Sequence, residues 1–360
     1  MKFNRYALSD LATIKYGKNQ KKVLSENGNI PIYGTGGLMG YATTALYDKP
    51  SVLIGRKGTI GKVKYVEHPF WTVDTLFYTI INTDIVLPKY LYYVMSLIDL
   101  NNYNEGTTIP SLRTETLNRL EFDIPSLVEQ ETILSCLNPI DEKIALNNAI
   151  NNNLEQQAQA IFKSWFIDFE PFSNRKPSEW SVSTLGNVSI MGAGGDKPQN
   201  VSPIKTDLYE YPIYSNGLSN EGLYGFTDKP KISEESVTVS ARGTIGFVCL
   251  RHIPYVPIVR LVTLIPKPEI ISAKYLYLWL KQLHITGTGT TQQQLTVPDF
   301  QKTEILVPSQ EIVTLFTATV EPIFEKIWFN QNENEKLSSL RDTLLPKLMT
   351  GELDVSDTEI

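Results

Sequence analysis

Residue types that usually carry catalysis or bind metal are sparse in this sequence. The chain has three histidines, His68, His252 and His284, and two cysteines, Cys136 and Cys249. No histidine has a cysteine or another histidine at the spacing that a zinc site requires. An Asn/Asp-Pro-Pro-aromatic methyltransferase motif is also missing. The sequence therefore argues against a metal site and against an enzyme with its own methyl-transfer centre.

Two short segments imitate catalytic motifs without meeting their requirements. Residues 55–63 read GRKGTIGKV, which is rich in glycine like a phosphate-binding loop. The segment lacks the Gly-x4-Gly-Lys-Ser/Thr spacing, and Val63 stands where a hydroxyl would have to bind magnesium. Residues 141–143 read DEK, as in some nucleases, but they fall inside a helical heptad pattern, which favours a solvated helix face.

Cationic and amide side chains beside glycines offer a different chemistry, because they can reach DNA phosphates and base edges. An arginine can bind guanine, and a glutamine can bind adenine, through two hydrogen bonds. The candidates are Arg56, Lys57, Lys62, Thr107, Thr108 and Arg113 in the first half, and Arg242, Thr290, Thr291, Gln292, Gln293 and Gln294 in the second.

These candidates have a plainer interpretation as well. The Gly-Thr-Ile-Gly sequence at 58–61 and 243–246 is also typical of a simple turn between strands. The cluster Lys15, Lys18, Lys21 and Lys22 is more typical of a phosphate anchor or a solvated loop than of a base reader.

The charge distribution permits DNA binding although the net charge is -6. Residues 127–170 hold seven acids and two bases, residues 309–350 hold six acids and four bases, and the last ten residues hold four acids. The remainder, 1–126 with 171–308, is net positive. A duplex is bound by local basic faces rather than by the global charge, so two mildly basic parts joined by acidic segments remain compatible with it.

The sequence predicts a cytoplasmic protein without a membrane partner. No run of about 18 apolar residues occurs, and the N-terminus lacks the apolar stretch of a signal peptide. Two cysteines far apart in a chain of 360 residues argue for a reducing compartment without a disulfide framework.

The chain repeats itself at an offset of roughly half its length, which indicates a duplication. The matches keep their order along the chain. They are Ile32-Tyr33 with Ile213-Tyr214, 48–50 with 228–230, 57–61 with 242–246, 89–92 with 274–277, 106–108 with 289–291, and 125–126 with 308–309.

Each half divides into a mixed α and β part and a helical part. Residues 51–54 and 236–239 read as strands before a glycine turn, while 89–97 and 274–283 read as short helices. The segment after each part begins behind a proline and has no glycine for about forty residues, which predicts a long helix.

Both predicted long helices carry a heptad seam, with apolar steps that alternate between four and three residues. The first seam runs Ile133, Leu137, Ile140, Ile144, Asn147, Asn151, Leu154, Ala158, Ile161 and Trp165; adding 183 gives Phe316, Val320, Ile323, Ile327, Asn330, Asn334, Leu337, Arg341, Leu344 and Leu348.

The two seams are complementary when the helices pair antiparallel about a local two-fold axis. Asn147 then faces Asn334 and Asn151 faces Asn330, while Ile140 meets Arg341 as the one poor match. Buried asparagines would fix the register at a cost in stability, because a slide by one heptad places them against aliphatic side chains. The alternative is a polar, solvated middle where the seam opens.

Such a helix pair would hold two equivalent globular parts. A pseudo-dimer of this kind suits two DNA half-sites about one helical turn, ~34 Å, apart. Because the two parts differ in sequence, the half-sites should differ, and the target should be bipartite and asymmetric.

Three segments carry a family resemblance that covers essentially the whole chain. Residues 159–169, QAIFKSWFIDF, resemble the central conserved region of type I restriction-modification specificity subunits, and 340–353, LRDTLLPKLMTGEL, resemble their distal one. Pro125-Ser126 followed by 129–131 is similar to the family's entry into the helix. The second entry, at 308–312, is abbreviated, so it departs slightly from the first.

The resemblance implies an α+β fold with two mixed α/β target recognition domains separated by two long antiparallel helices. The expected bounds are 1–126 and 173–308 for the recognition domains, 127–172 and 309–350 for the helices, and 351–360 for a tail. It also implies a non-catalytic chain that binds double-stranded DNA and two modification subunits, which carry S-adenosylmethionine and methylate adenine. Restriction subunits that use ATP and magnesium would join the same complex, and this chain itself would hold no cofactor.

Two other functions remain open at this point. The chain is also compatible with a specificity subunit of a related fused restriction-modification enzyme, which works with a single catalytic partner. A coiled-coil adaptor whose globular parts bind protein is the third interpretation, and deletion of both basic loops would then leave DNA binding untouched.

Overall fold

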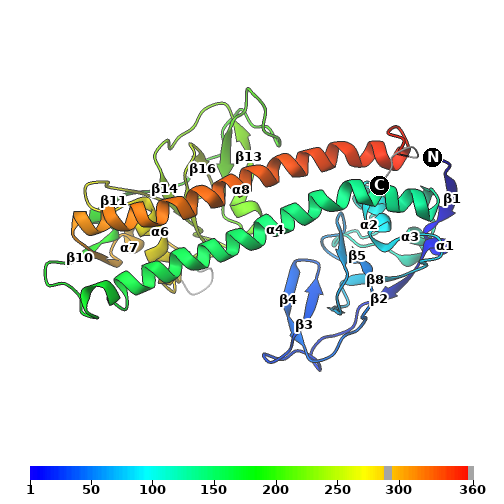
Figure 1. Ribbon diagram of the computed structural model, residues 1–360, viewed down its shortest axis with the longest axis horizontal. Helices are drawn as coiled ribbons and strands as arrows, with labels where there is room; N and C mark the ends of the chain where they lie inside the picture. The colour runs from blue at the N-terminus through cyan, green and yellow to red at the C-terminus, as the bar shows by residue number, and fades with distance from the viewer. Residues whose placement is uncertain (288–293, 356–360) are drawn as a thin grey trace. The chain divides into compact units, whose positions relative to one another are not determined.

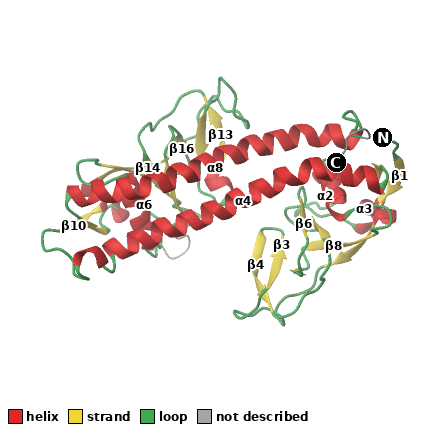
Figure 2. Cartoon of the chain, viewed as in Figure 1, coloured by secondary structure: helices red, strands yellow, loops and turns green. Residues whose placement is uncertain are grey.

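The computed structural model describes residues 1–287 and 294–355 and divides into two compact units. The first unit contains Met1–Asn147 with Asn332–Ile360, and the second contains Asn148–Gln331. Two long helices, α4 (Leu127–Phe166) and α8 (Gln310–Thr350), are unbroken, and each contributes one part to each unit (Figures 1 and 2). The two predicted helices of about forty residues are thus confirmed.

Two sheets form the β part of the first unit. The four-stranded antiparallel sheet has the order β2-β8-β5-β6, and the three-stranded sheet has the order β4-β3-β7, in which β3 and β7 are parallel. Their bounds are β2 (Ala12–Tyr16), β3 (Ile30–Gly34), β4 (Gly37–Ala42), β5 (Ser51–Gly55), β6 (Val63–Val66), β7 (Trp71–Thr72) and β8 (Leu76–Ile81). A separate pair joins β1 (Asn4–Ala7) to β9 (Glu121–Ile124).

Strand β5 is buried along its whole length because it is covered on both faces. Val52 and Ile54 enter a core shared with the helices of the unit, while Leu53 points into a second core with Tyr33 and Phe70. A strand covered on both faces reads as a continuous apolar run rather than as an alternating one. The helices of this unit are α1 (Leu8–Leu11), α2 (Pro88–Ser96), η1 (Leu100–Tyr103) and α3 (Thr114–Asn118).

The second unit repeats the first strand for strand. Its sheets have the orders β11-β17-β14-β15 and β13-β12-β16, again with one parallel pair, β12 with β16. The bounds are β10 (Ser181–Thr184), β11 (Ser189–Ala193), β12 (Tyr211–Tyr214), β13 (Leu223–Thr227), β14 (Ser236–Val239), β15 (Val248–Arg251), β16 (Val256–Pro257), β17 (Val262–Pro266) and β18 (Glu304–Val307), with α5 (Leu185–Val188), α6 (Ala273–Gln282), α7 (Val297–Phe300), η2 (Glu170–Phe172) and η3 (Ser219–Gly222). The predicted duplication and α+β class are therefore confirmed.

Antiparallel pairing of α4 with α8 is seen inside each unit separately. In the first unit Leu137 and Leu344 pack in one core. In the second unit Ile161 and Val320 share a core, and the rings of Trp165 and Phe316 lie 5.7 Å apart between centroids. The facing partners predicted from the seam are thus found in both units.

The predicted mismatch of Ile140 with Arg341 is resolved by the residue next to Ile140. Arg341 donates from Nη1 to Asp141 Oδ1 at 3.1 Å, so its charge leaves the apolar seam and is paired. Asp141 also accepts a hydrogen bond from the Tyr93 hydroxyl and lies 3.3 Å from Lys89 Nζ, both on α2. One carboxylate therefore joins α2, α4 and α8 in the first unit.

The environment of Asp141 shifts its pKa downward. Burial by itself raises the pKa, but hydrogen bonds from Tyr93 and Arg341 and the charges of Lys89 and Arg341 outweigh burial. The charged form is thus the one that the folded unit prefers.

In the described part of the chain, no helix is both long enough and apolar enough to cross a membrane.

Replacing Asp141 by Asn tests this junction. We expect the variant to lose about 1–3 kcal/mol of unfolding free energy at neutral pH, because two cations lose their carboxylate. A carboxylate with a lowered folded pKa contributes stability above its unfolded pKa of about 3.9, and this contribution disappears as pH falls through the lower folded value. Urea unfolding should show the difference from the unaltered chain narrowing below about pH 4.

Glu142→Gln is the matched control, because Glu142 is exposed and carries the same charge one residue away. An equal loss of stability in both variants, or a gap that stays constant with pH, would contradict the proposed role of Asp141.

Candidate nucleic-acid interface

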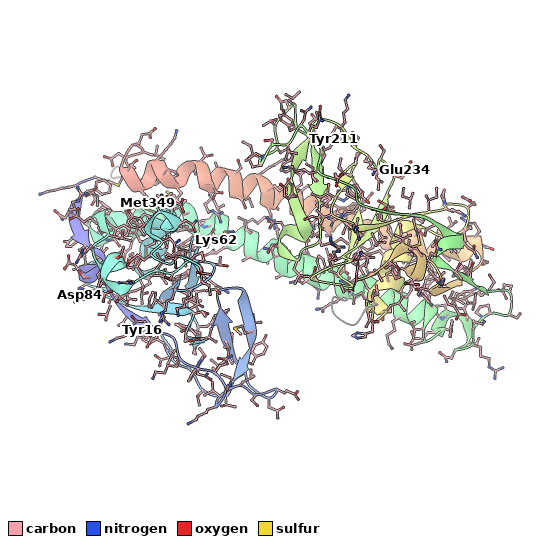
Figure 3. The ribbon with its side chains drawn as sticks, turned by 180° about the vertical axis from the view of Figure 1, so that it is seen from behind. Tyr16, Lys62, Asp84, Tyr211, Glu234 and Met349 are labelled. Atoms are coloured by element: carbon pink, nitrogen blue, oxygen red, sulfur yellow. The ribbon has the colours of Figure 1, made fainter. Side chains whose placement is uncertain are left out.

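The predicted glycine turn of the first unit joins β5 to β6, and residues 56–62 are called turn A. Gly58 has a φ of +85°, a left-handed conformation that glycine adopts without strain. A Cβ on Gly55 would collide with the Thr59 backbone, so this position needs glycine for close packing, whereas a Cβ on Gly61 would meet only the side chain of Asn101. Turn A exposes Lys57 and Lys62; Lys62 is labelled in Figure 3. The glycines therefore shape the turn, as the plainer interpretation proposed. The turn that they shape presents two lysines to solvent.

A second loop, residues 104–113, packs directly against turn A and is called loop B. The Gly58 amide donates to the Pro110 carbonyl at 2.8 Å, and the Leu112 amide donates to the Arg56 carbonyl at 2.9 Å. Lys57 and Ser111 form an isolated antiparallel bridge. The structure thus brings the two predicted groups of the first half together, with Thr107 and Thr108 exposed on loop B.

The two arginines of this face are held by neighbouring groups. Arg56 donates from Nη1 to the Asp74 carbonyl at 2.8 Å, and its guanidinium lies 5.0 Å from the centroid of the Tyr16 ring. Arg113 pairs with Glu105 at 3.1 Å. In contrast, Lys57 and Lys62 have no ion pair within the described ranges, so they are the more available cations for a phosphate.

The equivalent turn of the second unit, residues 241–246, is called turn A2. The Leu295 amide donates to the Ala241 carbonyl at 3.0 Å, as Leu112 does to Arg56 in the first unit. Arg242 is exposed and donates from Nη2 to Gln294 Oε1 at 2.9 Å, which brings two predicted residues together. Thr290, Thr291, Gln292 and Gln293 lie outside the described residues.

The four seam asparagines meet in the pairs expected from the sequence. Asn147 donates to Asn334 Oδ1 at 2.9 Å and to Glu333 at 2.7 Å, within the first unit. Asn330 donates to Asn151 Oδ1 at 2.8 Å, within the second. Asn147 is 1% exposed and Asn330 is 0% exposed, so the seam does not open to solvent at these two residues. That they set the register stays a prediction.

Two of the three histidines, His68 and His252, contact aromatic residues. His68 hydrogen-bonds the Tyr33 hydroxyl at 3.3 Å, and His252 stacks on Trp328 at 4.1 Å. Burial, with the charges of Lys274 and Arg251, lowers the pKa of His252 to about 4.

The lysine cluster lies on β2 and the segment that follows it, where Lys15, Lys18, Lys21 and Lys22 are all exposed. In the portion of the chain that is described, no three His, Cys, Asp or Glu side chains are grouped for a metal ion.

Sequence reasoning missed two residues of this surface. Tyr16 supports Arg56 from the end of β2, and it is half-exposed (Figure 3). Asn216 accepts a hydrogen bond from the Ala241 amide at 2.7 Å and so holds turn A2. The signal for Tyr16 in the sequence was an aromatic residue between Lys15 and Lys18. Nothing local in the sequence distinguishes Asn216 from an ordinary loop asparagine.

Comparison with known proteins identifies the family. The model described as type I restriction modification DNA specificity domain matches residues 2–156 and 177–339. The chain belongs to this family, which confirms the resemblance seen in the sequence and, with it, DNA specificity as the class of function.

Individual relatives agree with this assignment. The type I restriction enzyme MjaIX specificity subunit of Methanocaldococcus jannaschii is 28% identical over 354 residues, which cover 87% of this chain and 79% of the relative. The HindI specificity subunit of Haemophilus influenzae is 28% identical over 386 residues, 81% of this chain and 84% of the relative. The crystal structure of an S subunit from M. genitalium has a TM-score of 0.57 at 19% identity, over 97% of this chain and 96% of that one, and shows the shared fold.

Lys57→Ala tests whether turn A contacts DNA phosphates. We expect weaker binding to all duplex sequences and a salt dependence, log K against log salt, whose slope falls by about 1, because one counterion-releasing contact is lost. Titrations of labelled duplex at several salt concentrations measure both. Lys49→Ala, an exposed lysine outside turn A, is the control. An unchanged slope in Lys57→Ala would show that turn A does not touch the DNA backbone.

Proposed function

We propose that this chain selects the DNA sequence for a type I restriction-modification complex and performs no chemistry itself. Each unit contacts one half of a split DNA site through its glycine turn and the loop packed against it. The chemistry belongs to the other subunits of the complex.

The observation that carries the proposal is one framework that presents two different sets of side chains. Turn A presents Lys57 beside Ser111, while turn A2 presents Arg242 bonded to Gln294. Arginine and glutamine both offer paired hydrogen bonds to base edges, whereas lysine and serine are less selective. Two units with the same fold but different side chains at the glycine turn suit a bipartite, asymmetric target.

Two copies of one modification subunit would bind the long helices. Equivalent positions of the repeat, Leu146 on α4 and Phe329 on α8, are 183 residues apart and are 55% and 61% exposed. Exposed apolar side chains at matching places favour two identical partner surfaces. These partners would carry S-adenosylmethionine and methylate adenine, and restriction subunits with ATP and magnesium would complete the assembly.

The isolated chain should bind its target weakly. Each unit offers only a small set of loop contacts, so tight binding would require the modification subunits to enclose the duplex. Tight, sequence-selective binding by the chain alone would contradict this part of the proposal.

Genome-wide adenine methylation in a host that carries this chain and its modification partner tests the function. We expect long-read sequencing to reveal a split motif, with two short defined parts around unspecified bases. The motif should vanish when only this chain is deleted. If the modification partner is active and the deletion leaves adenine methylation unchanged, the proposal is contradicted and a protein-binding adaptor is favoured.

A further inference from the structure

The connection between β3 and β4 lies directly against turn A in the first unit. Gly34 pairs with Gly37, which leaves Thr35 and Gly36 as a two-residue hairpin turn (strands in Figure 1). A Cβ built on Gly58 would have Thr35 Oγ1 as its nearest neighbour, at 3.9 Å. The hairpin turn, turn A and loop B therefore form one continuous surface within this unit.

The second unit has the same arrangement with different residues. The connection after β12, residues 215–222, is fixed to turn A2 because Asn216 Oδ1 accepts from the Ala241 amide at 2.7 Å. Asn216 Nδ2 also donates to the Val259 carbonyl at 2.7 Å. In both units the connection between these two strands thus rests on the glycine turn.

These two connections differ far more than the turns that support them. The Gly-Thr-Ile-Gly sequence is identical in turn A and turn A2, whereas the connection is two residues long in the first unit and eight in the second. Side chains that distinguish one half-site from another must differ between the units. The connection meets this condition over its whole length, whereas the two glycine turns differ only beside their shared Gly-Thr-Ile-Gly sequence, as at Lys57 and Arg242.

The surface chemistry of the first hairpin suits a DNA groove. Leu38, next to the turn, is 54% exposed, and Met39 and Tyr41 on the same strand are also exposed, so β4 carries a group of exposed apolar side chains. The strand that follows is flanked by the segment of Lys21 and Lys22, because Ser25 donates to the Tyr41 carbonyl at 2.9 Å. An apolar side chain can contact the methyl group of thymine, and exposed lysines of the same unit can meet phosphates.

Gly36 is exposed at the tip of the hairpin. A Cβ at this position would meet nothing within 4 Å, and the backbone does not need the left-handed region. A glycine in open space at the tip of a hairpin leaves room for another molecule to approach the backbone closely.

We propose that the β3–β4 hairpin turn, Thr35 to Leu38, reads bases in one DNA half-site, with Gly36 at the surface of the duplex and Leu38 against a thymine methyl. The longer connection at 215–222 does the same for the other half-site. Turns A and A2 hold these connections and contact phosphates. This inference rests on the proposed function, and it assigns sequence choice to a different element from the glycine turns.

Two substitutions in the full chain, assembled with its modification subunits, test the hairpin. The probe is a duplex that carries the motif methylated by the unaltered complex. Gly36→Ala should leave the melting temperature unchanged and weaken binding about tenfold, because its methyl group fits the protein but not the DNA. Leu38→Ala should lower the preference for thymine over cytosine about tenfold at one position of one half of the motif.

Ile80→Ala is the matched control for Leu38→Ala, because Ile80 is an exposed apolar residue in the same unit. It lies four residues along β8 from the end that meets turn A, about 13 Å away, and it should leave affinity and motif unchanged.

Unchanged affinity and motif in both hairpin variants, with weaker binding in Lys57→Ala, would overturn the inference and leave the proposed function standing. If the unaltered complex methylates no motif, the proposed function fails and the inference fails with it. A loss of stability in Gly36→Ala would remove that variant as evidence, and the Leu38→Ala motif would then decide alone.

Discussion

Each long helix carries two asparagines in its seam, which is otherwise apolar except for Arg341 of α8, and we expect the remainder of the structure to depend on how these amides pair. The pairs give a partner to Asn147 Nδ2 and Asn330 Nδ2, whereas the Oδ1 atoms of these two residues are buried without a hydrogen bond among the described residues. Because an unpaired buried donor costs about 1–3 kcal/mol, we expect the pairs to favour one register. A slide of one heptad would place at least three of the four against aliphatic side chains. Because α4 and α8 each belong to both units, this one register determines which residues of the helices meet each recognition domain.

In the first unit, Asp141 on α4 connects the paired long helices to α2 through its contacts with Arg341, Tyr93 and Lys89. Helix α2 in turn packs on β5 and β6, the two strands that turn A joins. The second unit uses other residues for the same purpose: the Tyr277 hydroxyl on α6 donates to Glu155 on α4 at 2.6 Å. The framework is therefore repeated in its topology, while the contacts that secure it, like the side chains that it presents, are particular to each unit.

The elements with strong periodicity were predictable from the sequence, and the contacts between distant segments were not. The heptad seam gave both long helices and their facing residues, because a helix records its buried side every three to four residues. The apolar runs at 51–54 and 236–239 gave the central strands for a similar reason. The ion pair of Arg341 with Asp141 could not be predicted from the seam. The seam places Arg341 opposite Ile140 and gives no information about residues outside the seam.

The candidate interface was predictable only as a set of residue types beside glycines. The sequence named Lys57, Arg242 and Gln294, but it could not show that Arg56 is held by the Asp74 carbonyl, since backbone acceptors leave no signature. It also gave no reason to place Thr35 beside Gly58, because that proximity arises from the packing of one sheet on another.

The central claim is that two separately built units read two separate halves of one DNA site. Hydroxyl-radical footprinting of the full chain with its modification subunits, on a duplex that carries the methylated motif, tests this claim most directly. Two protected blocks are expected, with Lys57→Ala weakening protection of one block and Arg242→Ala weakening protection of the other. A single block, or equal loss of both blocks in each variant, would contradict it.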